Sequence, residues 1–217
     1  HQILLGFEAS DQLTDAKRSE ATFGPAANSR TTVALAQRLT LPTVTFGASS
    51  RSSLSKVRAL SAYVQDQLDL GDLIKVVLGL RYDDFRITST NRANGFAAAR
   101  SDGKWSPRAG LIIKPRENVS LYASYAKSFL PQSGDQFTVL DATTASLAPE
   151  EFRNLEAGVK WDLTERLAFT AAIFQIDRTN TRANDPVTGL VVQTGQSRTK
   201  GFELAMVGQV TKGLQVT

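Results

Sequence analysis

Apolar and polar side chains alternate along most of the chain, in segments of about ten residues that are separated by turn residues. The clearest case is the stretch 104–129, in which Pro115, Glu117 and Asn118 provide a turn between two alternating segments. One parity of these segments is apolar, and it comprises Trp105, Ala109, Leu111, Ile113, Val119, Leu121, Ala123 and Tyr125. A tilted strand of about ten residues is long enough to cross a bilayer. The hairpin therefore has one face suited to a protein core or to lipid.

The same alternation predicts an all-β chain of eight full strands and the start of another. Besides the two strands of the 104–129 hairpin, the predicted strands are 1–9, 57–68, 73–84, 152–163, 167–180 and 198–210, with a further one beginning after Gly213. The strand 167–180 is less regular, because Phe174 and Ile176 break the parity of the other apolar residues. A bulge near Ile173 or an interior partner for these two side chains would explain it.

Long and short connections alternate along the chain. Long polar segments are predicted at 10–55, 89–103, 131–151 and after Asn180, and short turns at Gly71, Arg116, Thr164 and Gly213. All short turns then lie on one edge of the sheet, as in outer-membrane barrels with short periplasmic turns and long outer loops. Greek-key sandwiches seldom separate their connections in this way.

The two faces of the strands fit a barrel wall. Several charged residues share the polar parity and would point into the lumen: Lys75, Arg81, Glu156, Lys160 and Glu203. Four aromatic residues lie near the strand ends, where they would form girdles: Tyr82, Trp105, Tyr125 and Trp161. We expect Arg108 and Ser124 to face the lumen, and Leu111 and Leu121 to face lipid.

Composition removes several classes of function. The 217 residues include no cysteine and a single histidine, His1, so Ser-His-Asp catalysis and histidine-rich metal sites lack their residues. No apolar run approaches the length of about eighteen residues that a membrane-spanning helix needs. The net charge is +4, but Lys and Arg are scattered, whereas nucleic-acid binding needs a basic patch. We therefore expect neither nucleic-acid binding nor a cofactor.

Two pairs of adjacent carboxylates are candidates for a catalytic acid and base. These are Asp83 with Asp84 and Glu150 with Glu151. Neighbouring residues on a strand point to opposite faces, so neither pair can act on one substrate. Solvated charges are the simpler interpretation, and no residue is assigned a catalytic role.

Six segments in order resemble the barrel strands of TonB-dependent outer-membrane receptors, in particular those for siderophores. The segments are AYVQDQLDLGDLIKVVLGLRYD, SPRAGLIIKP, LYASYAKSF, LEAGVKWDL with its Pro-Glu-Glu-Phe start, AAIFQIDRTNT and QSRTKGFELAM. The resemblance covers nearly all of the chain except 10–55. It implies an antiparallel up-and-down meander in the wall of an outer-membrane barrel of about 22 strands. Residues 1–217 would be a partial barrel domain, cut at both ends and without the plug.

The resemblance also implies a function and its partners. The intact receptor would bind ferric siderophores and import them with TonB-coupled energy, in contact with TonB, the plug domain, outer-membrane lipid and lipopolysaccharide. Aromatic and basic side chains at the outer rim suit flat, anionic chelates. The predicted substrate-binding residues are Phe85, Phe96, Phe129 and Phe137. The rim arginines Arg86, Arg92, Arg100 and Arg182 could instead meet lipopolysaccharide phosphates.

Two other functions stay open at this point. A passive porin-like barrel has the same composition and alternation, and a soluble all-β ligand-binding domain would bury its apolar face in a core. A passive porin would have no plug-encoding segment upstream of this chain. A soluble ligand-binding domain would be folded and monomeric without detergent.

Overall fold

The computed structural model describes residues 1–32, 42–131, 140, 144–188 and 191–217. Nine antiparallel strands form one sheet in which every strand pairs with its neighbours in sequence. The strands are β1 (Gln2–Phe23), β2 (Val44–Leu70), β3 (Ile74–Asn91), β4 (Ala97–Arg116), β5 (Val119–Leu130), β6 (Glu150–Thr164), β7 (Leu167–Asn184), β8 (Val191–Thr211) and β9 (Leu214–Val216). A short 3-10 helix, η1 (Thr144–Ser146), precedes β6. The predicted eight strands and one stub are confirmed.

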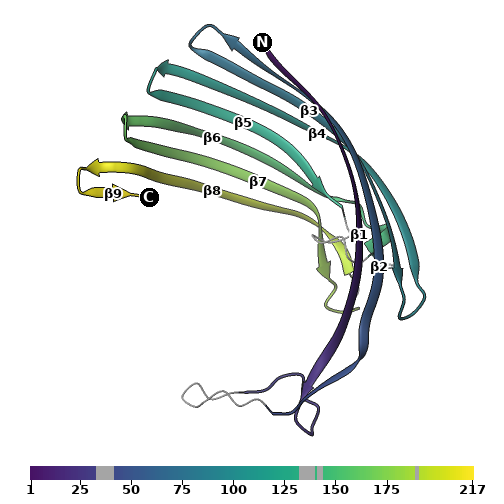
Figure 1. The fold of residues 1–217 in the computed structure, drawn as a ribbon. Coiled ribbons are helices and arrows are strands. Elements are labelled where there is room, and N and C mark those ends of the chain that lie inside the picture. The colour runs from purple at the N-terminus through teal and green to yellow at the C-terminus, as the bar shows by residue number, and fades with distance from the viewer. Residues whose placement is uncertain (33–41, 132–139, 141–143, 189–190) are drawn as a thin grey trace.

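The sheet is a strongly curved meander with two different edges (Figure 1). The short turns β2–β3, β4–β5, β6–β7 and β8–β9 all lie at one edge, on the left of the picture. The longer connections lie at the opposite edge, as the sequence predicted. Within the described part of the chain, no helix is both long enough and apolar enough to cross a membrane.

The strands extend much further toward the long-connection edge than the sequence predicted. The segment 10–55 was expected to be a loop, but β1 continues to Phe23 and β2 already begins at Val44. The predicted loop 89–103 is wrong in the same way, because only residues 92–96 separate β3 from β4. Here both faces of the sheet carry polar side chains, so the alternation that signals a strand is absent, while the backbone ladder continues.

The predicted separation of faces is confirmed. Leu111 pairs with Ala123 and Leu121 with Val159 on the apolar face, where the two leucines are 40% and 44% exposed. Arg108 and Ser124 lie on the polar face. The apolar face also exposes Phe7, Trp105, Ile173, Phe202 and Leu204. An unbroken apolar surface of this kind needs lipid or another apolar partner to cover it.

Of the two explanations offered for the irregular strand 167–180, the bulge near Ile173 is wrong, because β7 pairs in continuous register with both β6 and β8 through this residue. Phe174 breaks the apolar parity of the strand because it has an interior partner. Phe174 lies on the polar face opposite Gly201, and a Cβ at Gly201 would come within 2.5 Å of the Phe174 ring. The ring therefore fills the space that the glycine leaves, which makes Gly201 necessary for this packing.

The ladder between β4 and β5 ends early. Its last pair toward the long-connection edge is Arg108 with Ala126, and the next residue of β4 is Pro107, which has no backbone N–H to donate. Beyond this point β4 pairs only with β3, and β5 only with β6. The Nζ atoms of Lys104 and Lys127 contact the two carboxylate oxygens of Glu151 at 2.7 and 2.8 Å. These ion pairs join the two parts of the wall above the end of the ladder.

The face assignment predicts opposite effects of one substitution at two positions of β5. Leu121→Arg places a charge on the lipid-facing side and should destabilise the barrel by about 2 to 4 kcal/mol at mid-membrane depth. Ser124→Arg, on the polar face opposite Glu156, should be tolerated. Urea unfolding of the full-length barrel in lipid vesicles measures both. Equal destabilisation by the two variants would contradict the assignment.

Candidate functional site

The candidate site is the polar face near the long-connection edge, where a small core forms against the sheet. Val57, Phe85 and Ile87 from β2 and β3 pack with Leu140, which is 2% exposed. Three alanines surround this cluster: Ala59, Ala98 and Ala145. Leu140 and Ala145 lie between β5 and β6 in the chain, so these two described residues cover part of the polar face.

Polar contacts hold the same connection in place. Arg100 on β4 donates from Nη1 to the backbone oxygen of Ala145 at 2.9 Å, and Asp102 orients its guanidinium through two bonds of 2.6 and 2.7 Å. Asp102 is buried and Arg100 nearly so. A nearly buried guanidinium that a carboxylate holds in this way fixes the geometry of the backbone it contacts.

The end of the connection is tied to β7 and β8. Gln193 donates from Nε2 to the backbone oxygen of Ala148 at 2.7 Å, and its Oε1 accepts from the Ala148 N–H at 3.3 Å. Asn180 donates to the backbone oxygen of Pro149 at 2.9 Å. The chain therefore enters β6 at a defined angle, which positions Glu150.

Glu150 holds two arginines at the rim. Its Oε2 accepts from Arg178 Nε at 2.9 Å, and its Oε1 lies 3.9 Å from Arg182 Nε. The guanidinium of Arg178 lies 5.4 Å from the centre of the Phe152 ring on the same face. Glu150 is only 2% exposed, so its interpretation as a solvated charge is wrong. Both arginine side chains are partly exposed, which leaves two oriented cations beside an aromatic ring.

The predicted opposite orientation of adjacent carboxylates agrees with the contacts. Glu150 pairs with Arg178, whereas Glu151 pairs with Lys104 and Lys127. Asp83 accepts from Arg81 and Ser61, while Asp84 pairs with Arg86.

The three predicted phenylalanines that the structure describes do not gather in one place. Phe85 is buried in the small core, and Phe129 lies in β5 on the apolar parity, opposite Glu151 of β6. Phe96 is half-buried in the turn before β4, where its backbone oxygen accepts from the Asn91 N–H. Phe137 lies outside the described residues. The sequence analysis did not predict a role for Phe152 or Arg178. Phe152 lies on β6 with the same lumen-facing parity as Glu156, and Arg178 is its partner on β7.

The predicted rim arginines also have different surroundings. Arg86 and Arg92 are exposed and paired with Asp84 and Asp15 respectively. Arg100 is enclosed beneath η1, and Arg182 belongs to the pair of arginines around Glu150.

Beyond the rim, the turn after β7 is closed by Asp185. Its Oδ1 accepts from the backbone N–H of Val187 at 2.7 Å and of Thr188 at 3.2 Å. These two bonds stabilise the carboxylate and hold the pKa of Asp185 below its ordinary value.

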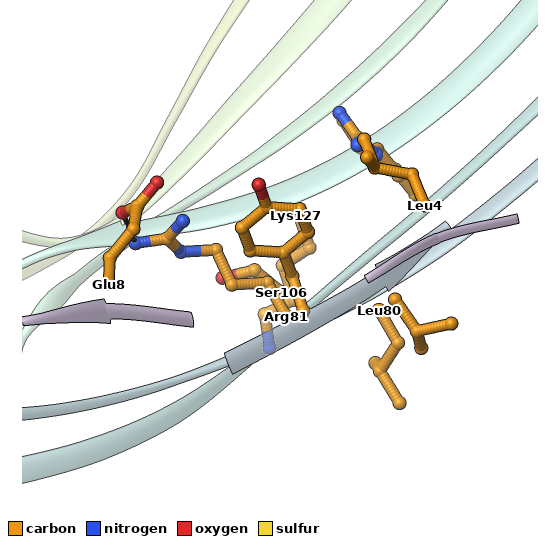
Figure 2. A pocket seen from close by; sticks show the side chains of 10 residues that line it. Leu4, Glu8, Leu80, Arg81, Ser106 and Lys127 are labelled. Carbon is orange, nitrogen blue, oxygen red and sulfur yellow. Dashed lines mark hydrogen bonds and ion pairs between the residues drawn. The ribbon is translucent and has the colours of Figure 1, made fainter. Parts of the chain in front are cut away.

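Lower on the polar face, a cavity of about 370 Å³ opens over β1 to β5 (Figure 2). Arg81 extends across it to Glu8, with 2.8 Å between Nη2 and Oε2, and its Nε donates to Asp83 at 2.8 Å. The guanidinium also lies 5.8 Å from the centre of the Tyr63 ring. Arg81 is therefore a paired structural cation.

The part of the chain that the structure describes contains no group of three or more acidic or histidine side chains that could hold a metal ion. Cations and aromatic rings, rather than metal ligands, dominate the rim.

One-sided turns, an apolar outer surface and a charged inner surface with an inserted connection define a section of the wall of a membrane-spanning β-barrel. The chain belongs to the TonB dependent receptor-like β-barrel family, whose family model matches residues 4–217. Proteins of this family are outer-membrane transporters of Gram-negative bacteria and not enzymes.

Relatives in this family include a probable siderophore receptor and a metal-pseudopaline receptor. A probable TonB-dependent siderophore receptor, PiuA of Acinetobacter baumannii, is 35% identical over 166 residues, which are 71% of this chain and 22% of PiuA. The metal-pseudopaline receptor CntO of Pseudomonas aeruginosa is 32% identical over 183 residues, which are 81% of this chain and 25% of CntO. The chain thus spans about a quarter of the length of these relatives.

Solved structures agree with this placement. The crystal structure of PiuA from Acinetobacter baumannii matches with a TM-score of 0.80 and 27% identity, over 97% of this chain and 33% of that one. The ferripyoverdine receptor of Pseudomonas aeruginosa, bound to ferripyoverdine, matches with a TM-score of 0.63 and 26% identity, over 79% of this chain and 23% of that one.

The contacts of Arg100 predict that it holds the inserted connection. Arg100→Ala leaves the Asp102 carboxylate buried without its cation, which should destabilise this region by about 3 to 5 kcal/mol. Amide hydrogen exchange of residues 144–149 in the full-length receptor should then become faster. Arg86→Ala is the matched control, since its exposed pair with Asp84 contributes about 0 to 1 kcal/mol. Unchanged exchange in the Arg100 variant would contradict the role of this contact.

Proposed function

We propose that this chain forms part of the wall of a larger barrel, in a receptor that binds ferric siderophores and imports them with TonB-coupled energy. The observation that carries the proposal is the likeness to the siderophore receptor PiuA, which covers 97% of this chain at a TM-score of 0.80. The alternatives of a passive porin and of a soluble binding domain are not favoured by membership of the receptor family.

The geometry of the rim supports an anionic, aromatic ligand. Arg178 and Arg182 converge on Glu150, which is buried, while their own side chains remain partly exposed. Their remaining N–H groups can donate to a ligand carboxylate or catecholate without a change in side-chain conformation. Phe152 adds an aromatic surface beside Arg178. A preorganised pair of cations next to a ring fits the charge and shape of a ferric chelate.

Of the phenylalanines predicted from the sequence, we propose that Phe96 contributes a contact at the rim. Phe85 would act indirectly, because it forms the floor on which Leu140 packs. Phe129 is on the opposite parity and would support the wall. TonB and the plug domain would be partners of the intact receptor, with the plug facing the polar surface that includes Arg81 and Arg108.

The transport function is tested in cells that depend on the full-length receptor. Uptake of a panel of iron-55-loaded siderophores should require both the receptor and TonB. Uptake of every chelate at the wild-type rate after deletion of the receptor gene would contradict the function, as would receptor-dependent uptake that continues without TonB.

Within that receptor, Arg178→Ala with Arg182→Ala should weaken binding of its ferric siderophore by about 100- to 10,000-fold, since each of the two charge-assisted bonds contributes about 1.5 to 3 kcal/mol. Arg116→Ala, at the end of β4 on the opposite edge, is the control and should have no effect. The measurement is the dissociation constant from quenching of intrinsic fluorescence. Unchanged affinity in the double variant would remove these arginines from the binding site without affecting the transport proposal.

A further inference from the structure

Arg108 of β4 is an exposed cation on the polar face of the sheet. No described residue forms an ion pair or a side-chain hydrogen bond with its guanidinium. Arg81, which lines the same cavity, extends to Glu8 at 2.8 Å (Figure 2) and pairs with Asp83 at 2.8 Å, so carboxylates compensate its charge. A guanidinium is always charged and carries several N–H donors, so Arg108 is available to bind an anion in the lumen.

The backbone of β3 fixes the position of the Arg108 side chain. Gly79 lies directly opposite Arg108 in the ladder, and a Cβ at Gly79 would come within 2.6 Å of Arg108 Nε and 2.8 Å of its Cγ. The side chain therefore lies flat across β3, in the space that the glycine leaves. A cation held against the wall in this way is positioned before any ligand arrives, which lowers the entropic cost of binding.

Arg108 lies close to the rim site and deeper in the lumen. It pairs with Ala126 of β5, and two residues nearer the long-connection edge Ser128 of β5 pairs with Phe152 of the rim. Adjacent strands are about 4.8 Å apart and residues two apart on a strand about 7 Å, so the Cα atoms of Arg108 and Phe152 are about 12 Å apart. On β5 the side chains between them belong to Ala126 and Ser128, and both are small.

The balance of charge favours movement of an anion from the rim toward Arg108. Arg178 and Arg182 share the carboxylate of Glu150, so the two cations at the rim are partly compensated. The charge of Arg108 has no such partner among the described residues. An anion that leaves the rim therefore meets an uncompensated cation about 12 Å further into the lumen, and its electrostatic attraction to the wall continues.

We propose that Arg108 is a second anion-binding position on the path of the ligand, which receives an anionic oxygen of a ferric chelate after the chelate leaves Arg178 and Arg182. A carboxylate or catecholate oxygen suits the paired N–H groups of the guanidinium. The hydroxyl-bearing side chains of Tyr63 and Ser106 line the same cavity and add donors beside it. This inference rests on the proposed transport function and deepens it, since it assigns Arg108 a role after the first binding step.

The test uses the full-length receptor and two chelates of different charge. A ferric tricatecholate is an anion, whereas a ferric trihydroxamate is uncharged. Arg108→Gln removes the charge, Arg108→Lys keeps it, and Gly79→Val keeps Arg108 but displaces its side chain from the wall. Arg86→Gln is the matched control, because it removes an exposed cation near the same edge from the opposite face of β3.

Binding to the purified receptor is measured by quenching of intrinsic fluorescence. In the R178A/R182A background, Arg108→Gln and Gly79→Val should weaken the residual binding of the tricatecholate by about tenfold, with Arg108→Lys and the control unchanged. In the wild-type background, Arg108→Gln should change the dissociation constant by less than about twofold, since the rim determines the first binding step. Residual binding that does not depend on Arg108 would overturn the proposal, as would an equal loss for the trihydroxamate.

Uptake in cells tests the order of the two positions. Arg108→Gln should lower uptake of the iron-55 tricatecholate at saturating concentration by about tenfold, and Arg108→Lys should restore most of it. Uptake at the wild-type rate would overturn the proposal. Increased entry of vancomycin together with unchanged residual binding would assign Arg108 to a plug contact and would also overturn it. Binding that depends on Arg108 in a receptor whose uptake does not require TonB would contradict the transport function alone.

Discussion

The whole structure depends on the requirement that backbone N–H and C=O groups be paired where no water is present. An unpaired group in a hydrocarbon environment costs several kcal/mol, so a chain that crosses lipid as strands must pair each one with its neighbours. Here the meander does this in the simplest order, each strand with the next. Because the backbone groups are paired within the sheet, the side chains can differ completely between the two faces. One face can therefore be apolar and contact lipid, while the other carries the charged residues of the lumen and the rim.

The same requirement decides which parts of the fold could be read from the sequence. Where one face meets an apolar medium, residues such as Leu111 and Arg108 alternate, and strand order, turns and faces were predictable. From Ser10 to Phe23 and from Val44 to Lys56 both faces are polar, so the strands leave no period-two signal. The ladder with the neighbouring strand holds these segments extended, and pairing between residues more than twenty positions apart, such as Phe23 with Val44, is not visible in local patterns.

The candidate site was less predictable than the fold, for a physical reason. Parity correctly separated Glu150 from Glu151, but it could not show that Glu150 is buried, because that depends on the contacts of Arg178 and on the path of the preceding connection. Phe85 was recognised as an aromatic residue near the rim, but its burial results from Leu140, far along the chain. Burial at the rim is a property of long-range packing, whereas orientation within a strand is local.

The early end of the β4–β5 ladder at Arg108 and Ala126 has a geometric consequence for the barrel as a whole. Below this point the circumference of the wall is fixed by hydrogen bonds between adjacent strands. Above it, the spacing between the β1–β4 and β5–β8 groups of strands is held by the side chains of Lys104, Lys127 and Glu151. The width of the mouth is therefore set independently of the width at the waist, so sequence changes around Pro107 can alter the aperture without altering the part that spans the membrane.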